Sequence, residues 1–132
     1  MALPFASNEW TLALADGLNK SKAYKDAAAK WEGDLCLIVS GPGVNKDIYI
    51  YLDLWHGDCR KAHSADAVVP SEFTITAPLA TWKEVVGGKL DPIRGLMTGK
   101  LKVKGPLAKI LKSPKAAIEL VNCAKALNTQ WP

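Results

Sequence analysis

The chain has 132 residues, a length that fits one domain and leaves no room for a second. Hydrophobic residues make up 48% and charged residues 23%, which is ordinary for a folded domain and argues against a disordered chain. No apolar run approaches the roughly 18 residues of a membrane span, and Met1–Phe5 lacks the features of a secretory signal. Three cysteines without a Cys-x-x-Cys spacing favour free thiols in a reducing compartment, so we expect a cytoplasmic protein.

The positive charge is concentrated in one stretch. Residues 89–115 hold eight basic residues and one acid, so this stretch carries +7 and the rest of the chain −3. Such a stretch favours an anionic partner: nucleic acid, an anionic membrane or an acidic small ligand. The positive charge is explained equally well if these lysines only keep an outer face of the domain in contact with water and bind no partner. The five tryptophans are scattered singly and form no stacking platform, which argues against nucleic acid.

The first thirty residues are predicted to be helical. Ser7 or Asn8 caps a helix over residues 9–18, whose apolar residues recur at four-residue spacing. A second helix follows over residues 22–30, where three consecutive alanines favour helix. The apolar period then changes from about four residues to two, which predicts that a sheet begins.

Four consecutive strands are predicted over residues 34–39, 47–55, 60–69 and 72–77, joined as a meander. In the second, Ile48, Ile50, Leu52 and Leu54 lie on one face and polar residues on the other. Gly41-Pro42-Gly43 is interpreted as a hairpin loop. This pattern is typical of an antiparallel sheet with one face on a core and the other in water.

Helices return after the fourth strand. They are predicted over residues 79–86, 92–98, 106–112 and 115–127, with a fifth strand over 100–104. Asp91 is the expected N-cap of the second of these helices and Pro92 its first residue; Ser113 and Pro114 do the same for the last. The order predicts an α+β fold with helices packed over one face of the sheet.

Common catalytic signatures are absent. The chain has no phosphate-binding loop, dinucleotide-binding glycine motif, Gly-x-Ser-x-Gly elbow or His-Glu-x-x-His pair, so we expect no cofactor and no metal. His56, Asp58, Cys59 and His63 resemble the parts of a thiol nucleophile site. Cys59 and His63 share a face only if their strand is unbroken, and nothing nearby supplies an oxyanion hole. We therefore expect surface or turn residues and no catalytic activity.

The short helices that follow the fourth strand carry more apolar positions than one packing seam needs. These positions are Trp82, Val85, Val86, Leu90, Ile93, Leu96, Met97, Ile110 and Leu111. Plain core packing explains them, and so does an apolar cavity for a ligand beside the sheet. The pattern alone does not separate the two interpretations.

One segment is similar to a known family. It runs Trp82-Lys-Glu-Val-Val-Gly-Gly-Lys-Leu-Asp-Pro-Ile-Arg-Gly-Leu-Met-Thr-Gly-Lys-Leu-Lys-Val-Lys-Gly105. It resembles the hallmark of the sterol carrier protein 2 (SCP-2-like) family: a tryptophan-led helix, Gly-x-x-Asp-Pro, an apolar stretch and Gly-Lys-Leu-Lys-Val. The resemblance implies a five-stranded, mainly antiparallel sheet whose helices enclose a hydrophobic cavity, in one lipid-binding domain over residues 1–132.

The resemblance also implies function. Members bind fatty acid, fatty acyl-CoA, phospholipid or sterol-like ligands without catalysis, which predicts lipid transport; the alternative is an accessory subunit that presents a hydrophobic substrate to a partner enzyme. Matched by motif, Trp82, Val85, Val86, Ile93, Leu96 and Met97 border the cavity, and Ile118, Val121 and Leu127 lie at its mouth on a lid helix.

Two further expectations concern location and partners. The chain ends Thr129-Gln130-Trp131-Pro132, without a peroxisomal import tripeptide, so we expect a free-standing cytoplasmic member of prokaryotic type. The basic stretch is expected to contact an anionic membrane transiently, or to meet the phosphates of an acyl-CoA.

Overall fold

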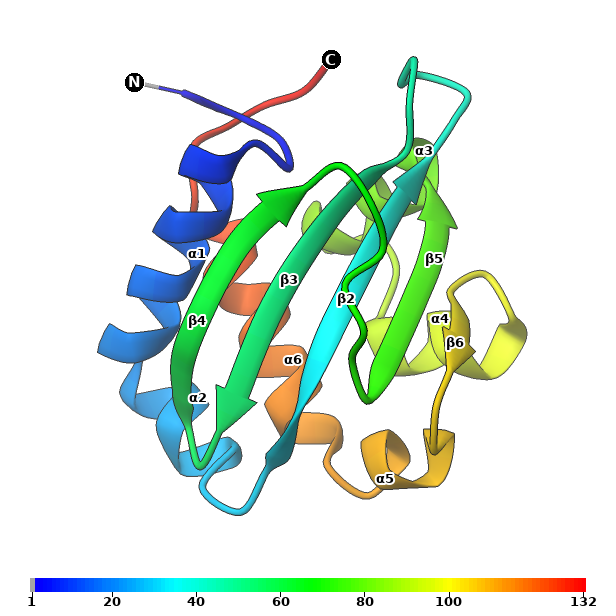
Figure 1. The fold of residues 1–132 in the computed structure, drawn as a ribbon. Coiled ribbons are helices and arrows are strands. Elements are labelled where there is room, and N and C mark those ends of the chain that lie inside the picture. The colour runs from blue at the N-terminus through cyan, green and yellow to red at the C-terminus, as the bar shows by residue number, and fades with distance from the viewer. Residues whose placement is uncertain (1) are drawn as a thin grey trace.

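The fold is built on one five-stranded sheet with helices behind it, as a computed structural model describes it for residues 2–132 (Figure 1). The strands of this sheet are β2 (Glu32–Ser40), β3 (Ile48–Trp55), β4 (Asp58–Ala65), β5 (Phe73–Pro78) and β6 (Lys102–Lys104). The helices are α1 (Asn8–Lys20), α2 (Lys22–Ala27), α3 (Leu79–Val86), α4 (Pro92–Thr98), α5 (Leu107–Leu111) and α6 (Pro114–Lys125). The α+β class and the placement of the helices on one face are confirmed.

The alternation along β3 sets the two faces of the sheet. Ile50, Leu52 and Leu54 are buried, whereas Tyr49 and Tyr51 between them are only partly buried. A strand places successive side chains on opposite faces, so one face of β3 packs on the core and the other lies nearer water. The predicted face is confirmed for this strand.

The predicted four-strand meander is wrong. Only β2, β3 and β4 form one; β5 pairs parallel with β2, and the order is β4-β3-β2-β5-β6. Residues 66–72, which the sequence assigns partly to a strand, instead leave β4 and cross the sheet on the face opposite the helices (Figure 1). Cys36 and Ile38 of β2 are accordingly buried although they point away from the helices. The sheet is therefore mixed, with three antiparallel pairings and one parallel pairing among the described strands.

Local capping explains where two helices begin. The Ser7 hydroxyl accepts a hydrogen bond from the Trp10 amide at 3.1 Å, which fixes the start of α1. The Asp91 carboxylate accepts from the amides of Ile93 and Arg94 at 2.8 and 3.2 Å, and Pro92 is the first residue of α4, as predicted. Ser113 is the N-cap of α6 but makes no side-chain capping bond.

Most element boundaries differ from the predictions by one or two residues, and three of the differences have a local cause. Helix α2 ends at Ala27 instead of Lys30, because the chain turns there and the Trp31 amide donates to the Ala28 carbonyl at 2.9 Å. Strand β4 ends at Ala65, where the crossing segment begins. Strand β6 is shorter than predicted because Leu101 turns inward and is buried ahead of it.

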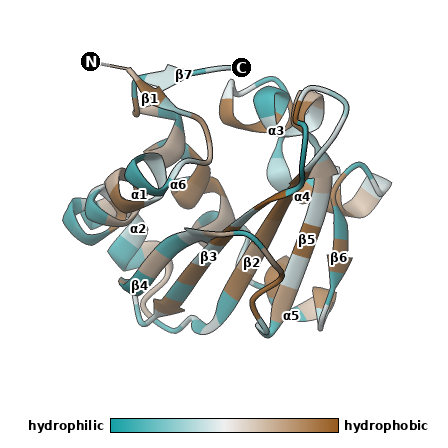
Figure 2. Cartoon of the chain, turned by 45° about the horizontal axis from the view of Figure 1, so that its top comes forward, coloured by the Kyte–Doolittle hydropathy of each residue, from teal (hydrophilic) through white to brown (hydrophobic). Residues whose placement is uncertain are grey.

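The two ends of the chain are joined in a small terminal clasp, formed by β1 (Leu3–Pro4) and β7 (Thr129–Gln130). Figure 2 places the two strands side by side, at one end of α1 and α6. The Phe5 ring lies 4.4 Å from the Trp131 ring and 5.0 Å from that of Trp10, whose indole donates to the Thr129 hydroxyl at 2.9 Å. The clasp thus holds the C-terminal end of α6 against the start of α1.

Replacing Trp131 by alanine is expected to lower the free energy of unfolding by about 2 kcal/mol, because Phe5 loses a ring contact and part of its cover. Urea denaturation followed by circular dichroism measures this. Lys46→Ala, in the exposed loop between β2 and β3, is the control and should change stability by less than about 0.5 kcal/mol. Equal stability of the Trp131 and Lys46 variants would contradict a stabilising clasp.

Candidate functional site

An apolar pocket lies between the sheet and the helices that follow it in the chain. Its sheet wall is made by Leu35 and Leu37 of β2, Leu54 of β3 and Ile75 of β5. Its remaining walls are made by Tyr24, Trp31, Trp82, Val85, Pro92, Leu96, Leu101, Ile110, Ser113, Ala116, Ala117, Leu120 and Val121. None of these residues carries a charge, and only Tyr24 and Ser113 bring a hydroxyl group.

The pocket encloses about 100 Å³. Pockets that hold ligands of drug size usually measure roughly 300–1,000 Å³. The space is therefore narrow for a long apolar molecule in this arrangement of the helices. The Trp82 indole donates to the Ile38 carbonyl at 2.9 Å and so anchors α3 to β2 beside the pocket.

The structure brings five of the eleven predicted ligand-contacting residues together around the pocket. These are Trp82, Val85, Leu96, Ile110 and Val121. Val86, Leu90 and Ile93 pack elsewhere in or against the core. Met97, Leu111 and Ile118 are exposed, because each lies on the outer side of a helix whose inner side reaches the pocket. Leu127 packs against the core beyond the end of α6 and does not line the pocket.

Sequence reasoning missed the sheet wall and the small residues of α6. Leu35 and Leu37 are two residues apart in the first predicted strand and therefore share a face. The sequence pattern is the same, however, whether a core leucine faces another side chain or an open space. Ala117 lies in the last predicted helix, and its small side chain leaves room beside the sheet. The small residues of the last helix were the signal in the sequence that could have indicated an open space beside the first strand.

Comparison with known proteins identifies the family. Residues 12–116 match the model of the SCP-2 sterol transfer family. The chain belongs to this family. SCP-2 domain proteins are in general carriers without catalytic activity, and the chain has the α+β fold of the family.

Solved structures agree over nearly the whole chain. A crystal structure of sterol carrier protein 2 is 40% identical, with a TM-score of 0.88, over 93% of this chain and 98% of that one. A conserved hypothetical protein from Thermus thermophilus is 38% identical, with a TM-score of 0.89, over 98% and 93%. Sterol carrier protein 2 from Yarrowia lipolytica is 25% identical, with a TM-score of 0.57, over 86% and 88%. No curated protein sequence shows significant similarity to the chain.

The SCP-2 fold also occurs inside an enzyme. A sec-alkylsulfatase from Pseudomonas is 18% identical, with a TM-score of 0.50, over 90% of this chain and 16% of that one. At this identity the likeness concerns the fold alone.

No helix within residues 2–132 of the chain is both long and apolar enough to cross a bilayer.

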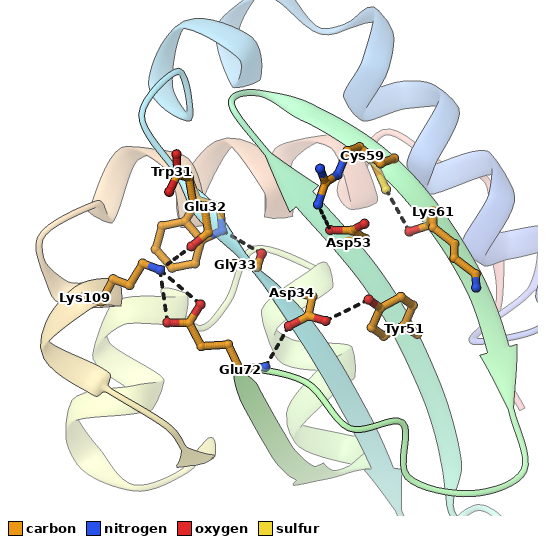
Figure 3. Close-up of polar contacts among 11 residues, drawn as sticks. Trp31, Glu32, Gly33, Asp34, Tyr51, Asp53, Cys59, Lys61, Glu72 and Lys109 are labelled. Atoms are coloured by element: carbon orange, nitrogen blue, oxygen red, sulfur yellow. Dashed lines mark hydrogen bonds and ion pairs between the residues drawn. The ribbon is translucent and has the colours of Figure 1, made fainter.

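A polar cluster lies at the end of the sheet where β2 begins and β3 ends (Figure 3). It consists of Glu32, Asp34, Tyr51, Glu72 and Lys109. The two Asp34 carboxylate oxygens accept from the Tyr51 hydroxyl and the Glu72 amide, each at 2.7 Å. The Lys109 ammonium donates to the Glu72 carboxylate at 3.0 Å and to the Glu32 carbonyl.

The contacts within the polar cluster give it a structural role. Both Asp34 oxygens are already occupied, and burial together with the Asp34 carboxylate raises the pKa of Tyr51, so the Tyr51 hydroxyl keeps its proton. Lys109 ties α5 to the start of β2 and to the end of the crossing segment. The cluster thereby holds α5, which supplies Ile110 to the pocket, in place.

The suspected thiol site does not assemble. A bulge at Arg60 shifts the register of β4, so Cys59 faces Leu54 on the core side and His63 faces Tyr51 on the other side. His56 contacts Glu32 at 2.6 Å and Asp58 pairs with Lys25 at 2.6 Å. Residues 2–132 contain no group of three or more His, Cys, Asp or Glu side chains placed to hold a metal ion.

Cys59 is expected to react slowly. Burial raises the pKa of its thiol to about 11, against about 8.5 for a free cysteine, so almost no thiolate exists at pH 8. We expect iodoacetamide to alkylate Cys59 at least tenfold more slowly in the folded protein than in urea, with a rate that rises as the pH approaches 11. Peptide mass spectrometry measures this, with Cys123, which is less buried, as the internal control. Fast alkylation of Cys59 at pH 8 would show an activated thiol.

Proposed function

We propose that the protein binds a lipid with a long apolar chain in this pocket and carries it, with residues 1–132 acting as one binding unit. Fatty acid, fatty acyl-CoA, phospholipid and sterol-like molecules are the ligand classes of the proposal. The observation that carries it is an uncharged pocket lined by one face of the sheet, helices α3 to α6, Tyr24 of α2 and Trp31. Membership of the SCP-2 sterol transfer family supports it independently.

The energetics favour recognition through the apolar chain. Burying each CH₂ group contributes about 0.8 kcal/mol, so a chain of about 16 carbons contributes up to about 13 kcal/mol before the costs of association. The pocket has no charged lining residue in the part of the chain that the structure describes, so no ion pair is needed within it. A headgroup then remains at the protein surface, where water or surface residues solvate it.

Binding is expected to widen the pocket, because about 100 Å³ does not hold such a chain. The terminal clasp holds the far end of α6, and Lys109 holds α5 to the sheet. Within residues 2–132, no side-chain hydrogen bond or ion pair joins the N-terminal half of α6, which contributes Ala116 and Ala117, to another element, and its first turn has no side-chain cap. We therefore place the movement that admits a ligand at this half of α6.

Native mass spectrometry of freshly purified protein tests the function, followed by solvent extraction and identification of any bound lipid. We expect a bound species of acyl or isoprenoid mass that added palmitate displaces. A mass of protein alone, with no change in tryptophan fluorescence on adding palmitate or palmitoyl-CoA, would overturn the carrier proposal. Stable co-purification with one enzyme and no lipid would instead support an accessory subunit.

The proposal places this activity in the cytoplasm and assigns no catalytic step. Cys36, Cys59 and Cys123 are free thiols in the structure, which suits a reducing compartment. The suspected thiol site is divided between two faces of the sheet, which leaves the lipid pocket as the feature to be tested.

A further inference from the structure

One margin of the molecule combines positive charge with an exposed apolar side chain. We call it the basic edge: Arg94 and Met97 of α4, Lys100 after it, and Lys102 and Lys104 of β6. All five side chains are exposed, and Met97 is 69% accessible. Among residues 2–132, the ion pairs involve none of these four cations.

The basic edge is the outer side of a pocket wall. Leu96 precedes Met97 and lines the pocket, and Leu101, between Lys100 and Lys102, lines it too. The Leu101 amide donates to the Gly95 carbonyl at 3.0 Å, which fixes the segment after α4 against that helix. Inward apolar residues therefore alternate with outward cations over a short segment, and Figure 1 shows α4 and β6 together at the margin of the fold.

Protection of a sheet edge accounts for only part of this pattern. Lys102 and Lys104 lie on β6, the last strand of the sheet, and lysines on an edge strand hinder pairing with other chains. Arg94, Met97 and Lys100 lie outside the strand. An exposed methionine is not a protective device, because it adds apolar surface to the same margin.

The one acid in this stretch does not neutralise it. Asp91 is the only acidic residue between residues 89 and 115, and its carboxylate caps α4 by accepting from the amides of Ile93 and Arg94. Among the acids of the polar cluster, Glu72 pairs with Lys109, and both carboxylate oxygens of Asp34 accept hydrogen bonds from Tyr51 and the Glu72 amide. The positive charge is thus local to the edge that backs the pocket.

We propose that the basic edge docks the protein on an anionic lipid bilayer, with Met97 entering the headgroup region. Cations are attracted to anionic headgroups, and an apolar side chain among them adds burial at the interface. The inference rests on the proposed lipid-carrier function, since docking by this edge brings the pocket wall at Leu96 and Leu101 to the membrane from which a lipid is taken.

Vesicle flotation tests the docking surface. The probe is a set of vesicles of phosphatidylcholine with about one third phosphatidylglycerol, compared with pure phosphatidylcholine, at low and physiological salt. We expect the wild-type protein to bind only the anionic vesicles, and less tightly at physiological salt. The triple variant Lys100→Gln, Lys102→Gln, Lys104→Gln should lose at least tenfold in affinity, since each lysine near such a surface contributes roughly fivefold.

A second triple variant controls for net charge. Lys22→Gln, Lys30→Gln and Lys46→Gln remove the same charge from exposed positions elsewhere and should lose less than about threefold. Met97→Ser, which keeps every charge, should weaken vesicle binding several-fold. Equal losses in the two triple variants, or salt-independent binding, would overturn the docking surface.

Palmitate binding without vesicles separates this proposal from the carrier function. We expect the Lys100, Lys102 and Lys104 variant to bind palmitate like the wild type. Palmitate binding without any vesicle binding by the wild type would remove the docking surface and leave the carrier function standing. If the triple variant kept vesicle binding but lost affinity for palmitoyl-CoA relative to palmitate, the edge would be a site for the phosphates of a soluble ligand, contrary to the proposal.

Discussion

Replacing Ala117 by phenylalanine is expected to abolish lipid binding while the fold remains. Ala117 lies on α6 and lines the pocket opposite the sheet. The pocket encloses about 100 Å³, so a phenyl ring placed there occupies space that an apolar chain needs. We expect at least a tenfold loss of palmitate affinity, measured by displacement of a fluorescent fatty acid, and a mass spectrum of the purified variant without bound lipid.

The stability of this variant should change little. Filling an apolar cavity stabilises a folded protein, whereas overpacking costs about 1–3 kcal/mol, so the two effects oppose each other. Ala80→Phe is the matched control, because Ala80 is exposed on α3 and does not line the pocket. Unchanged lipid binding by a folded Ala117 variant would place the ligand outside this pocket.

The parts of the fold that depend on neighbours in the chain were predictable. The Asp91 carboxylate fixes the start of α4 by accepting from amides two and three residues ahead, and Pro92 is the first residue of that helix. The alternation along β3 likewise gave the correct buried face. The parallel pairing of β5 with β2 depends on where residues 66–72 travel across the sheet, and no local period encodes that path. No local period encodes the bulge at Arg60 either, and this bulge places Cys59 and His63 on opposite faces of the sheet.

The site was predictable only in outline. Trp82 and Val85 lie on the pocket side of α3, in the segment that resembles the family hallmark. Leu96 and Met97 are adjacent in a seven-residue helix, and its few turns leave the inward side ambiguous, so both were predicted to face the ligand. Only Leu96 does. Whether an inward leucine meets a side chain or an open space depends on the packing of all the surrounding helices.

Replacing Gly105 by alanine is expected to destabilise the protein by about 3 kcal/mol or more. Gly105 follows β6 and has φ +130°, a conformation that side chains with a Cβ rarely adopt. An alanine Cβ would lie 2.5 Å from the Glu72 carbonyl oxygen and 3.0 Å from the ring of Phe73, which is fully buried. Since one neighbour is backbone and the other is core, neither moves without displacing β5.

Gly99→Ala separates the clash from the backbone strain. Gly99 ends α4 with φ +80°, and a Cβ added there meets nothing within 4 Å, so its cost is conformational only, about 1 kcal/mol. Urea denaturation followed by circular dichroism should therefore give a clearly larger loss for the Gly105 variant. Similar losses would mean that the chain around Glu72 and Phe73 yields easily. A larger loss would instead establish that Gly105, between β6 and α5, packs closely against the start of β5.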